Sequence, residues 1–159
     1  LMTEKAWKER QEAYQQEQES QKRLEQMTVD FVQPGERDLE KEHGFKGENA
    51  RPGSFRRRRN RESREGWFSY DMKVFKGQPM ALAVDYWGGY PGSKTFDILV
   101  DGEVIATEDI SNKKDGHFVN VIYDIPDKLT FGKDKITVIF KAHTGNTAGP
   151  VFGVRTIKR

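Results

Sequence analysis

Residues 96–107 read Phe-Asp-Ile-Leu-Val-Asp-Gly-Glu-Val-Ile-Ala-Thr. Apolar side chains occupy every second position up to Val100, a period of two that is typical of a strand with one buried face. The dipeptide Asp101-Gly102 suits a two-residue type I′ turn, because Asp and Gly tolerate the positive φ angles of that turn. Residues Glu103–Thr107 then return as the partner strand, so this stretch predicts a β-hairpin.

The same period of two continues on both sides of the hairpin, in short segments separated by turn residues. These further strands are expected over residues 68–74, 80–86, 119–125, 136–142 and 151–157. About seven or eight short strands with no helix between them favour two packed sheets over a parallel α/β fold. The sequence therefore predicts an all-β protein: a two-sheet antiparallel sandwich of jelly-roll or galactose-binding-like type over residues 66–159, preceded by an N-terminal helix.

Residues 1–27 form a charged N-terminal segment. From Thr3 to Met27 the chain is rich in Gln, Glu, Lys and Arg and contains no Gly or Pro, which predicts a helix. Its apolar stripe is thin, because Trp7 and Tyr14 stand a full seven residues apart. We therefore expect this helix outside the core, leaning on the sandwich, on another domain or on a second copy of the chain.

Residues 28–65 are interrupted by glycines and prolines, and only Val29–Val32 has the composition of a strand. We expect a connector with one short strand. Six arginines fall between residues 56 and 64. Such a cluster can bind phosphates, but a short Arg run without interleaved aromatic residues is more often a solvated or salt-bridged edge. The acidic stretch Glu36–Glu42 is an available internal partner, so we expect no nucleic-acid partner.

Overall composition excludes several classes of function. The 27 basic and 25 acidic side chains give a net charge of +2, so no global field favours nucleic acid or an anionic membrane as partner. No apolar run approaches the about 18 residues that cross a bilayer, and the N-terminus lacks the residue order of a signal peptide. With no cysteine, the chain can form no disulfide, thiolate nucleophile or Cys-ligated zinc site.

Catalytic and metal-binding patterns are also missing. His43, His117 and His143 fall in separate segments without a short metal-binding pair, so we expect structural or surface roles for them. There is no phosphate-cradling Gly-rich loop, nucleophile elbow or His-Glu-x-x-His motif. Strand-associated aspartates are expected to face solvent or close turns rather than to form a catalytic pair: Asp71, Asp85, Asp97 and Asp101. We therefore predict no catalytic residue, metal or cofactor in this chain.

Several stretches together resemble one known protein family. They are Glu42–Asn49 (EHGFKGEN), Gly66–Asp71 (GWFSYD), Tyr86–Gly88 (YWG), Phe96–Gly102 (FDILVDG) and His143–Gly149 (HTGNTAG), with Thr28-Val29-Asp30 after the charged helix. In combination they resemble the C-terminal β-sandwich of bacterial β-L-arabinofuranosidase-like proteins of glycoside hydrolase family 127, which are frequent in gut Bacteroidetes.

This resemblance implies that the catalytic machinery lies in another part of a longer polypeptide. The family carries a helical (α/α)₆ barrel with a cysteine-ligated zinc site and a catalytic glutamate, and no position of this cysteine-free chain can inherit them. The resemblance further implies that residues 1–27 link to that catalytic domain, which is the expected partner. It also implies a periplasmic or extracellular location.

Sugar binding by a sandwich requires aromatic faces for stacking and planar polar groups for the hydroxyls. Residues 86–92 (YWGGYPG) carry aromatic side chains on a Gly-rich segment at the end of a predicted strand, where ligands of jelly rolls often bind. The loop after residue 142 adds polar side chains. The candidate ligand-binding residues are Tyr86, Trp87, Tyr90, His143 and Asn146.

Two functions remain open at this point. The first is a non-catalytic accessory domain that supports or positions the catalytic part of a glycoside hydrolase; the alternative is a carbohydrate-binding module with weak affinity for plant-derived oligosaccharides. In the accessory interpretation Trp87 only plugs the end of the sandwich. Trp67 is expected in the core in both. A homodimer through the N-terminal helix is a further possible partnership.

Overall fold

The structure is a computed structural model that describes residues 3–89, 91–113 and 116–159. Its helices and strands are α1 (Glu4–Met27), β1 (Thr28–Val32), α2 (Arg37–Glu42), β2 (Lys46–Phe55), β3 (Arg58–Lys73), β4 (Met80–Trp87), β5 (Thr95–Val100), β6 (Glu103–Asp109), β7 (Phe118–Ile125), β8 (Lys135–Ala142), β9 (Thr147–Val151) and β10 (Gly153–Lys158). Short 3-10 turns, η1 (Ile110–Asn112) and η2 (Asp127–Leu129), follow β6 and β7.

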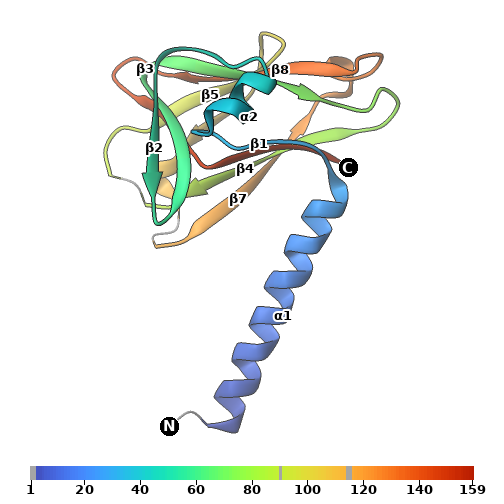
Figure 1. Ribbon diagram of the computed structural model, residues 1–159, viewed down its shortest axis with the longest axis vertical. Coiled ribbons are helices and arrows are strands. Elements are labelled where there is room, and N and C mark those ends of the chain that lie inside the picture. The colour runs from blue at the N-terminus through green and yellow to red at the C-terminus, as the bar shows by residue number, and fades with distance from the viewer. Residues whose placement is uncertain (1–2, 90, 114–115) are drawn as a thin grey trace.

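The strands form two antiparallel sheets that pack face to face (Figure 1). One sheet has the order β1-β10-β4-β7, and the other has the order β2-β3-β8-β5-β6 with β9 paired to β3. The predicted all-β sandwich with an N-terminal helix is confirmed. Its core lies between the sheets, and the largest buried side chains there come from both: Phe68, Tyr70, Met72, Met80, Leu82, Tyr86, Phe96, Ile98, Ile136 and Phe140. Burying each such side chain contributes about 1.5–3 kcal/mol.

The hairpin predicted from residues 96–107 is confirmed as β5 and β6. Val100 lies opposite Glu103, and the turn residues Asp101 and Gly102 have φ angles of 48° and 88°. Both positive angles are those of a type I′ turn, whose twist matches that of the flanking strands.

The prediction for residues 28–65 is wrong in its strand content. Instead of a connector with one short strand, the segment holds β1, α2, β2 and the beginning of β3, and all three strands belong to the two sheets. The glycines and prolines that suggested a connector lie within or beside paired strands, such as Pro52 opposite Arg61 and Gly53 opposite Asn60. Edge-strand β2 has a mostly exposed burial pattern, so it shows little hydrophobic alternation.

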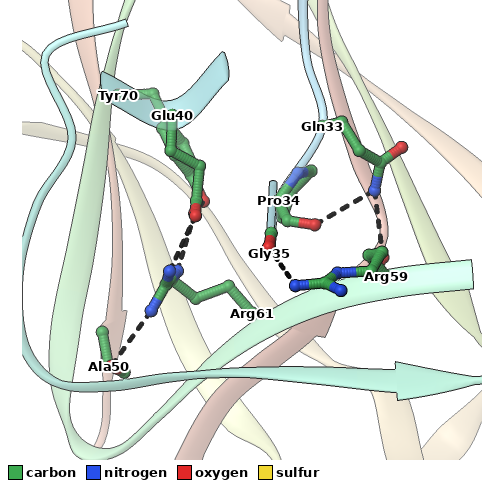
Figure 2. A network of polar contacts seen from close by, with 8 residues as sticks. All are labelled: Gln33, Pro34, Gly35, Glu40, Ala50, Arg59, Arg61 and Tyr70. Carbon is green, nitrogen blue, oxygen red and sulfur yellow. Dashed lines mark hydrogen bonds and ion pairs between the residues drawn. The ribbon is translucent and has the colours of Figure 1, made fainter. Parts of the chain in front are cut away.

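A buried ion pair fixes α2 to the six-stranded sheet (Figure 2). Arg61 donates to both carboxylate oxygens of Glu40, from Nε at 2.6 Å and from Nη2 at 2.7 Å, and Tyr70 donates to the same carboxylate at 2.6 Å. Burial alone would lower the pKa of Arg61, but the hydrogen bonds and charge of Glu40 outweigh it and raise that pKa. Burial and the charge of Glu40 raise the pKa of Tyr70 well above its ordinary value. The triad therefore holds one cation, one anion and one neutral phenol in the interior.

The chain between β1 and α2 is held by a second set of contacts in the same region (Figure 2). The Gln33 amide donates to the carbonyls of Pro34 and Arg59, while Arg59 donates to the carbonyl of Gly35. The same amide nitrogen lies 3.0 Å from the carbonyl oxygen of Phe152. Arg59 also lies 3.7 Å from Glu36. The expectation that Glu36–Glu42 neutralises part of the arginine cluster is confirmed for Arg59 and Arg61.

Helix α1 projects away from the sandwich (Figure 1). The Thr3 hydroxyl accepts a hydrogen bond from the Ala6 amide and caps its first turn. Among its described residues, the C-terminal end approaches the four-stranded sheet, where Leu24 and Met27 pack near a small buried group of β4 and β10 side chains. Trp7 is 54% exposed and Tyr14 is 60% exposed. None of the described helices is long and apolar enough to cross a membrane.

Candidate functional site

An aromatic cluster closes one end of the four-stranded sheet. Trp87, the last residue of β4, lies opposite Phe118, the first residue of β7, and their rings meet edge to face at 4.8 Å between centroids. Phe55 comes from the tip of the β2–β3 hairpin and contacts Trp87 in a similar arrangement at 5.0 Å. Phe152 contacts Phe118 at 5.0 Å. The tip of a hairpin from one sheet thus reaches the end of the other.

A row of polar groups lies directly beside these rings. Asp85 accepts hydrogen bonds from Arg58 at 3.1 Å and from Asn120 at 2.8 Å. The guanidinium of Arg58 also lies 4.5 Å from the centre of the Phe118 ring. Asp85 and Asn120 are paired across β4 and β7, so both side chains stand on the face of the sheet that points away from the core. Planar amide, carboxylate and guanidinium groups next to aromatic rings are the groups that sugar recognition uses.

The two residues at the tip of the β2–β3 hairpin are both arginines. Phe55 pairs with Arg58, and the intervening Arg56 and Arg57 have φ angles of 49° and 67°. Left-handed backbone costs a residue with a Cβ about 1–2 kcal/mol. Both side chains are exposed, and the guanidinium of Arg56 lies 4.9 Å from the centre of the Trp87 ring. Positive charge therefore covers the Trp87 side of the aromatic cluster.

The predicted site residues are brought only partly together. The carbonyl of Ser93 accepts from the Thr147 amide, and the carbonyl of Thr95 accepts from the His143 amide, so the loop that follows Trp87 runs beside the loop of residues 143–146. Asn146 accepts from the Thr95 amide through its side-chain oxygen at 3.1 Å. Trp87 at the end of β4 and the loop with His143 and Asn146 thus lie at the same end of the sandwich, but Asn146 serves the loop structure itself.

His143 is engaged with strand β5 rather than left free. Its Nε2 lies 2.8 Å from the carboxylate of Asp97, which also accepts from the Thr107 hydroxyl at 2.6 Å. Burial opposes ionisation of Asp97, but the hydrogen bonds from Thr107 and His143 outweigh it and lower the pKa of Asp97. This group lies on the outer face of the six-stranded sheet.

Tyr86 is a correction to the predicted site. Its side chain is 0% exposed and points into the core, because it stands on the same face of β4 as Met80, Leu82 and Val84. Its hydroxyl lies 2.9 Å from that of Tyr123, which donates to the nearly buried Glu108 at 2.6 Å. Tyr86 is therefore part of a buried network that reaches the other sheet through Tyr123, and it cannot stack on a ligand. Tyr90 lies outside the described residues.

Trp67 is a second correction. It was expected in the core, but it lies opposite Lys141 on the outer face of the six-stranded sheet, half-buried, with its indole donating to Glu48 at 3.2 Å. Its neighbour Phe68 takes the core position instead. A shift of one residue exchanges the two faces of a strand, so the buried alternation of Phe68, Tyr70 and Met72 places Trp67 on the outer face.

Sequence reasoning missed most of the cluster around Trp87. Phe55, Arg58, Phe118 and Asn120 come from segments far apart in the chain, and two of them lie in the segment that was taken for a connector. The pairing of β4 with β7, which brings Phe118 and Asn120 beside Trp87 and Asp85, leaves no local signal. Within the described part of the chain, no group of three His, Asp or Glu side chains is placed to hold a metal ion.

Solved structures share this fold with the chain. A family 35 carbohydrate-binding module from Clostridium thermocellum superposes with a TM-score of 0.55 at 10% identity, over 79% of this chain and 95% of that one. A family 36 carbohydrate-binding module in complex with calcium and xylotriose gives 0.52 at 12% identity, over 79% and 98%. An exo-β-1,3-galactanase from Phanerochaete chrysosporium gives 0.57 at 11% identity, over 79% of this chain and 28% of that one.

The chain thus has the two-sheet β-sandwich fold of these carbohydrate-binding modules, with a partly exposed aromatic cluster at one end. A search by sequence among curated proteins finds no match. Residues 23–157 match a family described as "Family of unknown function (DUF6805)", and the chain belongs to this family. The match begins within the last part of α1, so it covers the sandwich and leaves out most of the projecting helix.

Proposed function

We propose that this protein is a non-catalytic carbohydrate-binding module and that it binds oligosaccharides at the aromatic cluster of Phe55, Trp87 and Phe118. The observation that carries the proposal is the position of this cluster on the loop end of a jelly-roll sandwich, beside the polar row of Arg58, Asp85 and Asn120. The rings offer apolar surface to a sugar face, and the polar row offers donors and acceptors to its hydroxyls. His143 and Asn146 would contribute only at the edge, from a neighbouring loop.

The experiment is a calorimetric titration with arabinose-containing and other plant oligosaccharides, supported by tryptophan fluorescence. We expect saturable binding by the native protein and loss of at least about tenfold in affinity for Trp87→Ala, because removal of a central aromatic contact typically costs about 2 kcal/mol or more. Trp67→Ala is the matched control, since it removes a half-buried tryptophan from the other sheet. Asn120→Ala tests the polar row without altering the aromatic cluster.

Each outcome has a defined meaning. Binding that survives in Trp87→Ala and Asn120→Ala but is lost in Trp67→Ala would move the site to the outer face of the six-stranded sheet. No heat and no fluorescence change at millimolar concentrations of every sugar would contradict the carbohydrate-binding proposal. Thermal unfolding and circular dichroism of each variant identify any loss that comes from misfolding.

A second function is the positioning of a catalytic domain in a longer glycoside hydrolase, as the family 127 resemblance implies. Two observations favour it: the galactanase with this fold in 28% of its chain, and the exposed Trp7 and Tyr14 of α1. In that case α1 would pack on the catalytic domain or on a second copy, in a secreted or periplasmic enzyme that acts on plant glycans. The titration above separates the two functions, because this one requires no affinity for sugar.

A further inference from the structure

The tip of the β2–β3 hairpin has an unusual sequence for its conformation. A type I′ turn requires positive φ at both central residues, and Asn-Gly or Asp-Gly meets this requirement with little strain. The β5–β6 hairpin of this protein uses Asp101-Gly102, whereas the β2–β3 hairpin uses Arg56-Arg57. The two arginines are therefore held at this tip against the preference of the backbone, and such strain often marks a functional position.

Among the described residues, neither of these two arginines is neutralised by an ion pair, a property they share with Arg64. In the cluster, Arg58 pairs with Asp85, Arg59 with Glu36 and Arg61 with Glu40. For Arg56 and Arg57, no carboxylate partner is found among the described residues. Asp85, the carboxylate of the polar row, is already shared by Arg58 and Asn120. The end of the sandwich with the aromatic cluster therefore carries an excess of positive charge.

Arg56 is placed to use that charge next to a sugar ring. Its guanidinium lies over Trp87 at 4.9 Å and near Phe55 at 5.6 Å from the ring centres. Stacking on an aromatic face leaves the N–H groups at the edge of the guanidinium free to bind an anion in a bidentate manner. It also restricts the long side chain before binding, which lowers the entropy that an incoming ligand must overcome.

We propose that the Arg56-Arg57 turn makes this site selective for acidic sugars, by binding the anionic group of a sugar residue that contacts the Trp87 cluster. The anionic group is a carboxylate or a sulfate ester, and both fit the fork of a guanidinium. This inference rests on the proposed carbohydrate binding and adds the chemical class of the ligand.

The test replaces the turn with the sequence that its backbone prefers, Arg56→Asn together with Arg57→Gly. This variant removes both cations and should raise the thermal unfolding temperature, because the strain is relieved, so a loss of affinity in it does not come from misfolding. The ligands are uronate oligosaccharides, the same oligosaccharides as neutral methyl esters, and sulfated oligosaccharides. We expect the native protein to prefer the charged ligands by about tenfold or more, and the variant to lose this preference while still binding the neutral ester.

Salt provides an independent measurement. Exposed charges are screened as ionic strength rises, so the preference for the charged ligand should shrink between about 0.05 M and about 0.5 M salt, and the affinity for the ester should change little. Comparison of the affinities for uronate and for sulfated oligosaccharides shows which anion is bound.

Three results would overturn the inference in distinguishable ways. Equal affinity for acid and ester, with binding still lost in Trp87→Ala, would reject acidic selectivity and leave the carbohydrate-binding function intact. No binding of any sugar would reject both. Tighter binding of a single-stranded oligonucleotide than of any acidic sugar would reassign the arginines to nucleic acid.

Discussion

Arg59 and Arg61 stand two residues apart on β3, yet their ion pairs differ in kind. Arg59 is 52% exposed and lies 3.7 Å from Glu36, whereas Arg61 is 10% exposed and bonds Glu40 at 2.6 Å. An exposed pair gains little, because water and salt screen it. A buried pair costs desolvation when it forms, but its loss leaves a charge without a partner in the interior.

Arg61→Ala should therefore lower the free energy of unfolding by about 3–5 kcal/mol, because it leaves the Glu40 carboxylate buried with only Tyr70 as donor. Urea denaturation followed by circular dichroism measures this change. The matched control is Arg59→Ala, which should cost about 0–1 kcal/mol. Equal effects of the two substitutions would show that the buried triad is not a stabilising unit.

The lowered pKa of Asp97 predicts a dependence of stability on pH. A carboxyl whose pKa is lower in the folded protein than its ordinary value of 3.8 stabilises the fold while it is ionised. That contribution is present above about pH 4 and disappears as the pH falls through the folded-state pKa. Native protein should thus be more stable than Asp97→Asn at neutral pH, and the difference should vanish in acid. Thermal unfolding of both proteins from neutral pH down to about pH 2 checks this, and a constant difference would contradict it.

At the scale of elements, the β2–β3 hairpin connects the two sheets, whereas α1 projects away from them. The hairpin crosses from the six-stranded sheet to the end of the four-stranded sheet, where Phe55 and Arg58 contact side chains of β4 and β7. Helix α1, as far as it is described, lies against the sandwich at its C-terminal end, where Leu24 and Met27 pack. Packing of an apolar face, which supplies most of the stability of a helix in a protein, is nearly absent from the first turns of α1.

Removal of residues 1–20 should consequently leave the thermal unfolding temperature of the sandwich almost unchanged. The helical signal in circular dichroism should fall at the same time, and the difference between the two measurements isolates α1. A large drop in the unfolding temperature would mean that α1 stabilises the sandwich through a contact between copies. Sedimentation of the full chain and of the shortened chain then tests that contact, because only the full chain would form a dimer.

At the scale of the whole molecule, two buried polar networks hold the layers that position the site. One is the Glu40–Arg61–Tyr70 triad beneath α2, and the other joins Tyr86 of β4 and Tyr123 of β7 to Glu108 of β6. Burial raises the pKa of Tyr86 and of Tyr123 well above the ordinary value for tyrosine, so both phenols stay uncharged. This second network connects β4 and β7 to β6 of the opposite sheet. Its residue in β4, Tyr86, is next to Trp87, and its residue in β7, Tyr123, is a few residues from Phe118.

The sequence by itself determined the parts of this protein that follow local rules. Alternation of period two located the strands after residue 66 except β9, which lies mostly in a stretch expected as a loop. Asp101-Gly102 specified the β5–β6 turn, and uninterrupted charged residues specified α1. These features depend on neighbours in the chain, so no knowledge of distant contacts is required. Among the predicted site residues that the structure describes, Trp87 alone lies in the aromatic cluster, and it was found because it ends such a strand.

Only the tertiary structure decided which side chains surround Trp87 and which way they face. Phe55 and Phe118 reach it through pairing and packing of segments more than thirty residues away on either side. Tyr86 and Trp87 are adjacent aromatic residues, and the face of β4 on which each stands sends one into the core and the other to the site. Edge strand β2 has few buried positions and showed no alternation, so its place in the sheet, and with it the arginine turn, became visible only once its partner β3 was in position.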